Sequence, residues 1–171
     1  MPSAKFRSGA LFSSLSPHYQ TPKATYALLD REFRFTDDPC PLGGKGGLAR
    51  EWRGAVYVNP PYGSEVPKWI RKAIHEIVAG RSTVVVFLLP ARTDTRWFHE
   101  LVLPHAAQLR FVRGRLRFIK GAKSGSAPFP SCVIVFTPES VREGPLQGTA
   151  LEAPPIDRWL SETRLPTKQG E

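Results

Sequence analysis

The chain has 171 residues, of which 41% are hydrophobic, and a formal net charge of +9 from 24 Lys and Arg against 15 Asp and Glu. This length and composition favour one globular domain with its own core and exclude a wholly disordered or fibrous chain. The basic excess favours a polyanionic partner, although a basic surface also serves solubility alone.

Cysteine usage and hydropathy exclude several further classes. Cys40 and Cys132 lie too far apart to form a close metal-ligand pair, and no His/Cys spacing typical of zinc surrounds them. We therefore expect a reduced protein with no metal. No segment approaches the ~20 apolar residues of a membrane helix, and residues 1–15 lack the continuous apolar run of a signal peptide. We expect a cytoplasmic protein without membrane contact.

The first half of the chain alternates helical and extended patterns. Residues 1–18 predict a flexible arm, and Thr21-Pro22 predicts the start of a helix over 23–32, with Thr21 as its N-cap. Residues 33–38 predict a short strand, and residues 42–47 a glycine-rich loop. A second strand is predicted over 55–58 because two prolines stop it, and a helix over 66–77 that closes at Gly80.

The second half is richer in strands. The continuous apolar run 83–89 predicts a strand covered on both faces, followed by a helix over 94–103. Next we expect a strand over 108–112, a turn at Arg113-Gly114, an extended run over 116–119, a loop over 120–126 and a strand over 131–136. This order predicts an α/β fold whose sheet is mostly parallel, with antiparallel strands at its C-terminal side and helices on both faces. We expect the domain to span residues 19–138 and residues 139–171 to form a tail.

The tetrapeptide Asn59-Pro60-Pro61-Tyr62 directly follows the predicted strand 55–58, and parallel α/β sheets bind ligands beyond the carboxyl ends of their strands. An exocyclic base amine attacks a methyl group only when its lone pair is withdrawn from the ring, which two acceptors aimed at its hydrogens favour. The Asn59 side chain and the Pro60 backbone supply such oxygens, and Tyr62 suits stacking on an extruded base. On the tetrapeptide alone, a plain proline turn explains these residues equally well.

An ordered set of motifs extends this pattern along the chain. The set comprises Thr21-Pro22, residues 35–40, Gly47-Leu48 with Trp52, Asn59 to Gly63, Trp69 with Lys72-Ala73, residues 89–95 with Trp97-Phe98, and Gly114-Arg115-Leu116 with Phe118. Over residues 19–136 the chain thereby resembles S-adenosylmethionine-dependent amino-methyltransferases, and more narrowly the phage-type DNA N-6-adenine methyltransferases of the Dam family. The resemblance implies methyl transfer from S-adenosylmethionine to the N6 amine of adenine in DNA, on a Rossmann-like methyltransferase sheet.

The resemblance also implies roles for individual residues. Thr21 and Pro22 would hold the methionine end of the cofactor at a helix N-terminus. The residues that would border the cofactor at the end of the first strand are Asp38, Pro39 and Cys40. The catalytic residues, which would hold the target amine and base, are Asn59, Pro60, Pro61 and Tyr62.

The chain departs from the family pattern in two places. The glycine-rich signature after the first strand is not clearly spelled, and Gly46 stands where similar proteins usually have an acidic residue, a candidate partner for the adenine amine of the cofactor. The segment between Cys40 and Asn59 is also short and leaves little room for two further strands. We therefore expect a reduced sheet.

Positive charge concentrates between Leu101 and Pro138, where six Lys and Arg occur without an acidic residue. The alternation of Arg113, Arg115 and Arg117 predicts one basic face of an extended segment, suited to DNA phosphates, although a solvated hairpin face is the plain alternative. The candidate contacts to double-stranded DNA are Arg92, Arg96, Arg113, Arg115, Arg117, Lys120 and Lys123.

Two other functions fit the same residues. Asn-Pro-Pro-Tyr also serves methylation of other planar amines or amides, and Gly46 suggests a DNA-binding protein of the same fold with weak or lost transfer. The recognition sequence, the oligomeric state and the biological role, whether protection of a phage genome, partnership with a restriction enzyme or regulation, do not follow from the sequence.

Overall fold

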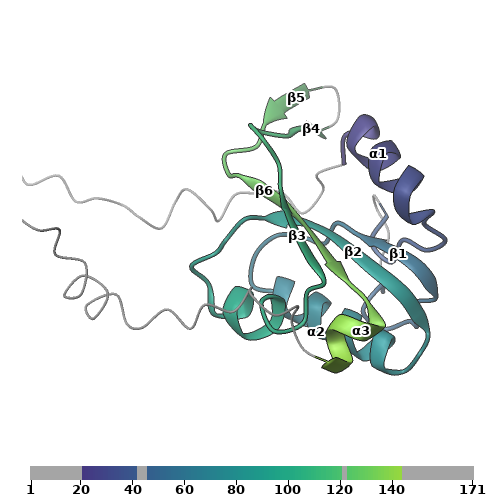
Figure 1. The fold of residues 1–171 in the computed structure, drawn as a ribbon. Helices are drawn as coiled ribbons and strands as arrows, with labels where there is room; N and C mark the ends of the chain where they lie inside the picture. The colour runs from purple at the N-terminus through teal and green to yellow at the C-terminus, as the bar shows by residue number, and fades with distance from the viewer. Residues whose placement is uncertain (1–20, 42–45, 121–122, 144–171) are drawn as a thin grey trace, which may run out of the picture.

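The structure, a computed structural model, describes residues 21–41, 46–120 and 123–143; the expected arm over 1–18 and the greater part of the expected tail lie outside these ranges. The elements are α1 (Lys23–Phe33), β1 (Gly54–Val58), α2 (Val66–Val78), β2 (Ser82–Pro90), η1 (Phe98–Val102), β3 (Gln108–Phe111), β4 (Arg117–Lys120), β5 (Lys123–Ser126), β6 (Ser131–Phe136) and α3 (Pro138–Glu143) (Figure 1).

The main sheet has four strands in the order β1-β2-β6-β3. β1 and β2 are parallel and are joined through α2, which makes a βαβ unit, the building block of Rossmann-like sheets. β6 is antiparallel to both of its neighbours, so β1, β2 and β3 run one way and β6, the last strand of the described residues, opposes them. The α/β class and the antiparallel C-terminal side are thus confirmed.

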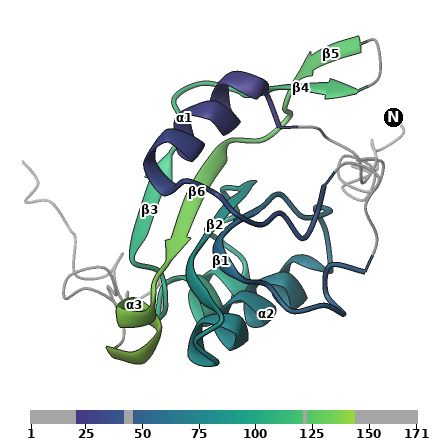
Figure 2. The same ribbon diagram turned by 90° about the vertical axis from the view of Figure 1, so that its right-hand side faces the viewer.

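Helices cover both faces of this sheet, as predicted (Figures 1 and 2). Successive residues of β2 alternate between two cores because strand side chains point to opposite faces. Phe87 packs with Ile70 of α2 and Phe98 of η1, whereas Val86 packs with Leu29 of α1. Because β2 is buried on both faces, its residues form a continuous apolar run, and this run is the pattern that predicted the strand from the sequence.

Residues 33–38 do not form the predicted strand. α1 extends to Phe33 and ends where Arg34 takes the left-handed conformation (φ 52°). The chain then runs beside β1, but only an isolated parallel bridge joins Asp37 to Val56. Since the described residues 46–53 contain no strand either, the sheet is reduced, as expected.

Three predictions for the second half are wrong in detail. The helix expected over 94–103 is helical only over 96–102: residues 96–97 form an α-helical start and the rest is the π-helix η1, whose last turn closes with a bond from Leu103 N–H to Phe98 O of 2.9 Å. The loop expected over 120–126 contains β5, which pairs with β4 as a second, two-stranded sheet. α3 lies where the tail was expected to begin, and it packs against α2 with Ser140 buried.

Within the ranges that the structure describes, no helix is both long and apolar enough to cross a membrane.

Candidate functional site

A chain of hydrogen bonds surrounds Asn59 just beyond the carboxyl end of β1. The amide Nδ2 of Asn59 donates to Thr21 Oγ1 at 3.0 Å, and the hydroxyl of Tyr62 donates to Asn59 Oδ1 at 2.7 Å. Thr21 Oγ1 also lies 2.7 Å from the hydroxyl of Tyr57 in β1. The Asn59 carboxamide is therefore held at both of its ends, by residues 38 positions before it and three after it.

This arrangement revises the structural prediction for Thr21. Pro22, not Thr21, is the N-cap residue of α1, and no side-chain bond caps the helix. The carbonyl of Pro22 accepts the first helical N–H, from Tyr26, at 3.0 Å. The Thr21 hydroxyl lies one residue earlier, where it contacts Asn59 and Tyr57.

The Tyr57 and Tyr62 hydroxyls, which belong to this series of hydrogen bonds, stay protonated. Burial raises the pKa of Tyr57, and the nearby Asp38 carboxylate raises it further, while its bond to Thr21 opposes the shift. Burial also raises the pKa of Tyr62 well above its usual value. Both groups therefore serve as neutral hydrogen-bonding groups rather than as bases.

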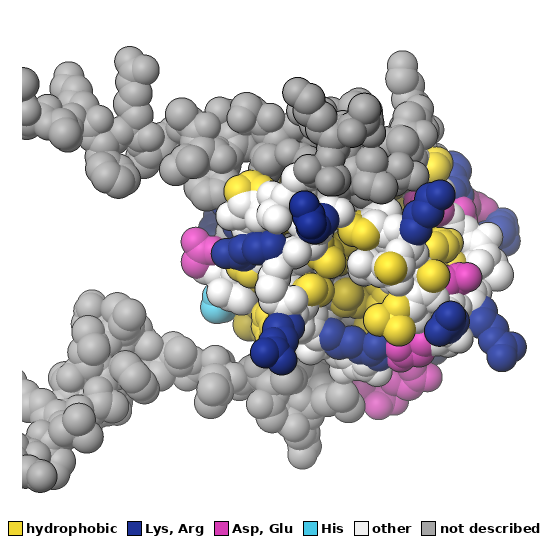
Figure 3. Space-filling view, turned by 90° about the horizontal axis from the view of Figure 1, so that it is seen from above, with side chains coloured by type: hydrophobic (Ala, Val, Ile, Leu, Met, Phe, Trp, Pro, Cys, Tyr) yellow, Lys and Arg dark blue, Asp and Glu magenta, His cyan; other side chains and the backbone are white. Residues whose placement is uncertain are grey.

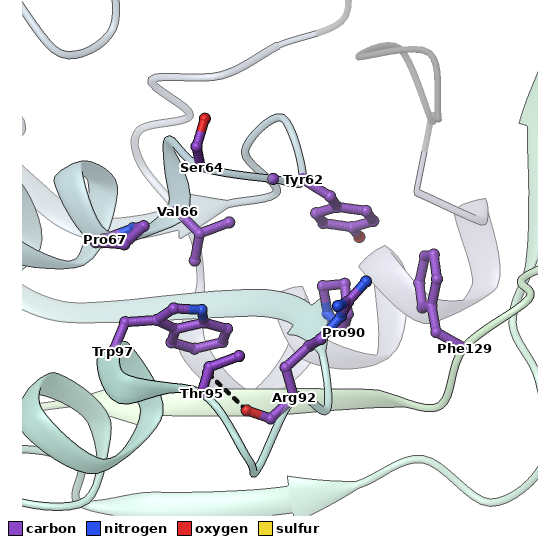
Figure 4. A pocket seen from close by; sticks show the side chains of 10 residues that line it. Tyr62, Ser64, Val66, Pro67, Pro90, Arg92, Thr95, Trp97 and Phe129 are labelled. Atoms are coloured by element: carbon purple, nitrogen blue, oxygen red, sulfur yellow. Dashed lines mark hydrogen bonds between the residues drawn. The ribbon is translucent and has the colours of Figure 1, made fainter. Parts of the chain in front are cut away.

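A pocket of about 310 Å³ lies beside Tyr62, at the carboxyl ends of β1 and β2 (Figure 4). This volume is at the lower end of the range for small-molecule pockets, roughly 300–1,000 Å³. The rings of Tyr62 and Phe129 meet edge to face with centroids 5.5 Å apart, and Trp97 lies on the other side of the pocket. Asn59 does not itself line the pocket. Tyr62 links Asn59 to the pocket, because its ring forms one wall of the pocket and its hydroxyl donates a hydrogen bond to Asn59.

The predicted cofactor-side residues Asp38, Pro39 and Cys40 directly follow Asp37, whose carbonyl accepts the Tyr57 N–H at 2.9 Å. Asp38 is half-buried, and burial raises its pKa although its Oδ1 accepts the Cys40 N–H at 2.9 Å. Its negative charge also raises the pKa of Tyr57 and of Tyr26, in both cases less than burial does. The Cys40 thiol has its pKa raised to about 11 by burial, so it is not a nucleophile at neutral pH.

The neighbouring Asp37 has a different role, because it forms an ion pair with Arg50 at 2.6 Å that lowers its pKa. Among the described residues, no group of three or more His, Cys, Asp or Glu side chains is placed to hold a metal ion.

Glycines shape the segment that follows these residues. Gly46 has a φ of +78°, a conformation that L-residues adopt only with strain, and its carbonyl accepts from Ala49 in a turn. This backbone geometry gives a structural reason for glycine at this position. At Gly47 a Cβ would lie 2.0 Å from the Pro39 carbonyl oxygen, so Gly47 and Pro39 pack backbone to backbone.

The predicted DNA contacts fall into two groups. Arg113, Arg115 and Arg117 are all exposed near the β4–β5 hairpin, but a turn at Gly114 (φ +78°) interrupts the extended segment. The predicted alternating face over 113–117 is therefore wrong, and only Arg117 belongs to β4. The backbones of Lys120 and Lys123 end β4 and begin β5. Seen from above, hydrophobic side chains occupy the middle of the visible face, with Lys and Arg and some Asp and Glu side chains around them (Figure 3).

The remaining two arginines differ from each other. Arg92 lines the pocket beside Tyr62, whereas Arg96 is 90% exposed and pairs with Glu100 at 3.0 Å. Glu100 offsets the charge of Arg96, which weakens its attraction for a phosphate.

Two residues of the site were not singled out by the sequence. Tyr57 sits inside a strand and reads as a core residue, and Phe129 lies between two prolines with no periodic pattern around it. Only the fold reveals the hydrogen bond between Tyr57 and Thr21 and the ring contact between Phe129 and Tyr62.

An α/β sheet with an Asn-Pro-Pro-Tyr turn at a strand end, beside a pocket of about 310 Å³, is the arrangement expected of an amino-methyltransferase. The model of the family "DNA N-6-adenine-methyltransferase (Dam)" matches residues 11–144, so the chain belongs to this family. This confirms the resemblance inferred from the sequence motifs.

Among curated proteins, none matches the chain. Among solved structures, the chain is similar to a Pyrococcus horikoshii protein described as a "putative RNA methyltransferase", with 18% identity and a TM-score of 0.38. The similarity covers 53% of this chain and 46% of that protein, so the chain spans less than half of its length.

Proposed function

We propose that the protein transfers a methyl group from S-adenosylmethionine to the N6 amine of adenine in double-stranded DNA. The observation that carries the proposal is the Asn59 carboxamide, fixed at the carboxyl end of β1 beside the pocket, in a chain of the Dam family. The family supplies the reaction type, and the geometry of Asn59 and Tyr62 fits the acceptor chemistry that the reaction needs.

The residues near Asp38 fit the charges of S-adenosylmethionine. That molecule carries a sulfonium, an ammonium and a carboxylate. The half-buried Asp38 carboxylate has a raised pKa because burial removes water from its charge, so a bound cation would stabilise it. The N-terminus of the 11-residue α1, which follows Pro22, offers backbone N–H groups to a carboxylate. Asp38, Pro39 and Cys40 are thus proposed to border the cofactor.

S-adenosylmethionine supplies an electrophilic methyl group when it is bound. The Asn59 Oδ1 and the Pro60 carbonyl oxygen accept hydrogen bonds from the two N–H groups of the target amine. These bonds withdraw the nitrogen lone pair from conjugation with the ring, so that it can attack the methyl group. A carboxamide oxygen has two lone pairs, so Asn59 can accept from the amine and from Tyr62 together. As the N–C bond forms and the S–C bond breaks, the nitrogen releases a proton to solvent, and no general base is required.

We propose that the target base enters the pocket and stacks against the Tyr62 ring. This ring and the edge-on Phe129 form an aromatic corner, and base–aromatic stacking contributes about 1–3 kcal/mol per base. Arg92, on the same wall, is placed to neutralise a phosphate beside the extruded nucleotide. The exposed Arg113, Arg115 and Arg117 extend the basic surface along the duplex.

Incubation with methyl-labelled S-adenosylmethionine and duplex DNA, followed by digestion to nucleosides, tests the proposal. We expect labelled N6-methyl-2′-deoxyadenosine from the DNA. Label on cytosine or only on protein would redirect the proposal to another planar amine or amide. DNA retention without any transfer would favour the DNA-binding alternative instead.

A further inference from the structure

The Thr21 hydroxyl lies at a branch point of the hydrogen-bonded chain that holds Asn59. It accepts from Asn59 Nδ2 at 3.0 Å and lies 2.7 Å from the Tyr57 hydroxyl, which is itself fixed in β1. Tyr57 is almost fully buried, with 2% of its surface exposed, and its ring contacts those of Tyr26 and Phe35. The position of Thr21 is therefore anchored to the sheet through Tyr57 rather than to the helix that follows it.

We propose that Thr21 is a positioning residue that sets the orientation of the Asn59 carboxamide, and that its hydroxyl does not serve the cofactor. This inference rests on the proposed methyl transfer. With Nδ2 directed at Thr21, the amide plane is fixed and Oδ1 is turned the opposite way, toward Tyr62 and the target amine. A 180° rotation of the carboxamide would present N–H groups to the target amine, and an N–H cannot accept its hydrogens.

The physical consequence is preorganisation. Without the Thr21 oxygen, the carboxamide loses the acceptor for one Nδ2 hydrogen and gains freedom to rotate, so the productive orientation is populated for less of the time. Substrate and cofactor contacts elsewhere in the site are unchanged by this loss. The rate of the bound complex should therefore fall, while the affinities for DNA and S-adenosylmethionine should not.

Steady-state kinetics of Thr21→Val and Thr21→Ser test the proposal. Valine keeps the shape but removes the hydroxyl, and serine keeps the hydroxyl. We expect Thr21→Val to lower kcat by about 10–100-fold, with each KM within about threefold of wild type. Thr21→Ser should keep kcat within about threefold. A large rise in the KM for S-adenosylmethionine with kcat unchanged would overturn the proposal and return Thr21 to the cofactor.

A double-mutant comparison with Asn59→Ala separates positioning from a general structural effect. When the carboxamide is absent, removing the Thr21 hydroxyl should cost less than about twofold in residual transfer. If Thr21→Val lowers transfer equally in both backgrounds, Thr21 does not act through Asn59. If wild type transfers methyl groups but Thr21→Val matches it, only this inference fails; if wild type transfers none, the proposed function fails with it.

Discussion

Replacement of Gly47 by alanine should disturb the cofactor side of the site through its backbone contact with Pro39. A Cβ at this position would lie 2.0 Å from the Pro39 carbonyl oxygen and 2.8 Å from Trp69 Cη2. The backbone oxygen cannot move aside alone, and the Gly47 carbonyl is itself held by the indole N–H of Trp52 at 2.7 Å. The segment carrying Pro39 and Cys40 must therefore shift.

Overpacking of this kind costs typically 1–3 kcal/mol, and a contact this close to backbone should reach the upper part of that range. We expect Gly47→Ala to lose about 2–3 kcal/mol in urea denaturation, or roughly 4–12 °C in Tm for a protein of this size. Titration calorimetry should also show S-adenosylmethionine binding weakened by about tenfold or more, because Pro39 is a proposed cofactor neighbour.

The matched control is Gly125→Ala in β5, where an added Cβ meets nothing within 4 Å. This variant should keep wild-type stability within about 0.5 kcal/mol, since surface substitutions are usually that small. Wild-type stability in Gly47→Ala would refute the packing argument. Reduced stability with unchanged cofactor affinity would refute the link between Pro39 and the cofactor.

Three further sets of substitutions probe the stacking residue, the basic surface and a buried carboxylate. Tyr62→Phe keeps the ring and should retain transfer within about tenfold, whereas Tyr62→Ala should lower kcat/KM by about 10–100-fold in the nucleoside assay. Arg115→Gln and Arg117→Gln should weaken DNA binding and each reduce the slope of log K against log salt by about 1, while Arg96→Gln, whose charge is already offset, should change it least. Glu76 is fully buried, and its partners Lys72 and Arg81 lower its pKa from 4.5 to about 2. Its stabilisation is complete above pH 4.5 and is lost as the pH falls toward 2, so the stability gap between wild type and Glu76→Gln, about 3 kcal/mol for a pKa shift of this size, should close over that interval in pH-dependent denaturation.

Elements buried by their own hydrophobic pattern were predictable from the sequence. β2 is apolar along its length because α1 and α2 cover opposite faces of it, and α2 repeats apolar residues at helical spacing for the core side. The tetrapeptide at the end of β1 was also placed correctly, since prolines stop a strand regardless of tertiary context.

Features that depend on a pairing partner rather than on their own residues were not predictable. β5 has the composition Lys-Ser-Gly-Ser, which has low strand propensity, and it is extended because β4 pairs with it. Arg110 counted toward the basic stretch, yet it forms an ion pair with Glu32, 78 residues earlier, at 2.5 Å. Charge totals along a segment cannot show that such a side chain is already paired.

The residues of the candidate site divide in the same way, into those that sequence motifs predicted and those that only the fold brings together. Family motifs located Asn59 and Tyr62, and local rules suggested a helix cap at Thr21, but its hydroxyl bonds across the fold instead. Phe129 carries no local signal, and its role as a pocket wall arises only where the loop before β6 meets Tyr62.

The central claim is that Asn59 enables methyl transfer to adenine. The most direct measurement is modified-base sequencing of DNA from cells that express either wild type or Asn59→Ala. We predict N6-methyladenine in a defined sequence context with wild type, and at least about 100-fold less with a folded Asn59→Ala protein that still binds DNA. Equal adenine methylation by both proteins, or none with wild type at comparable expression, would contradict the account.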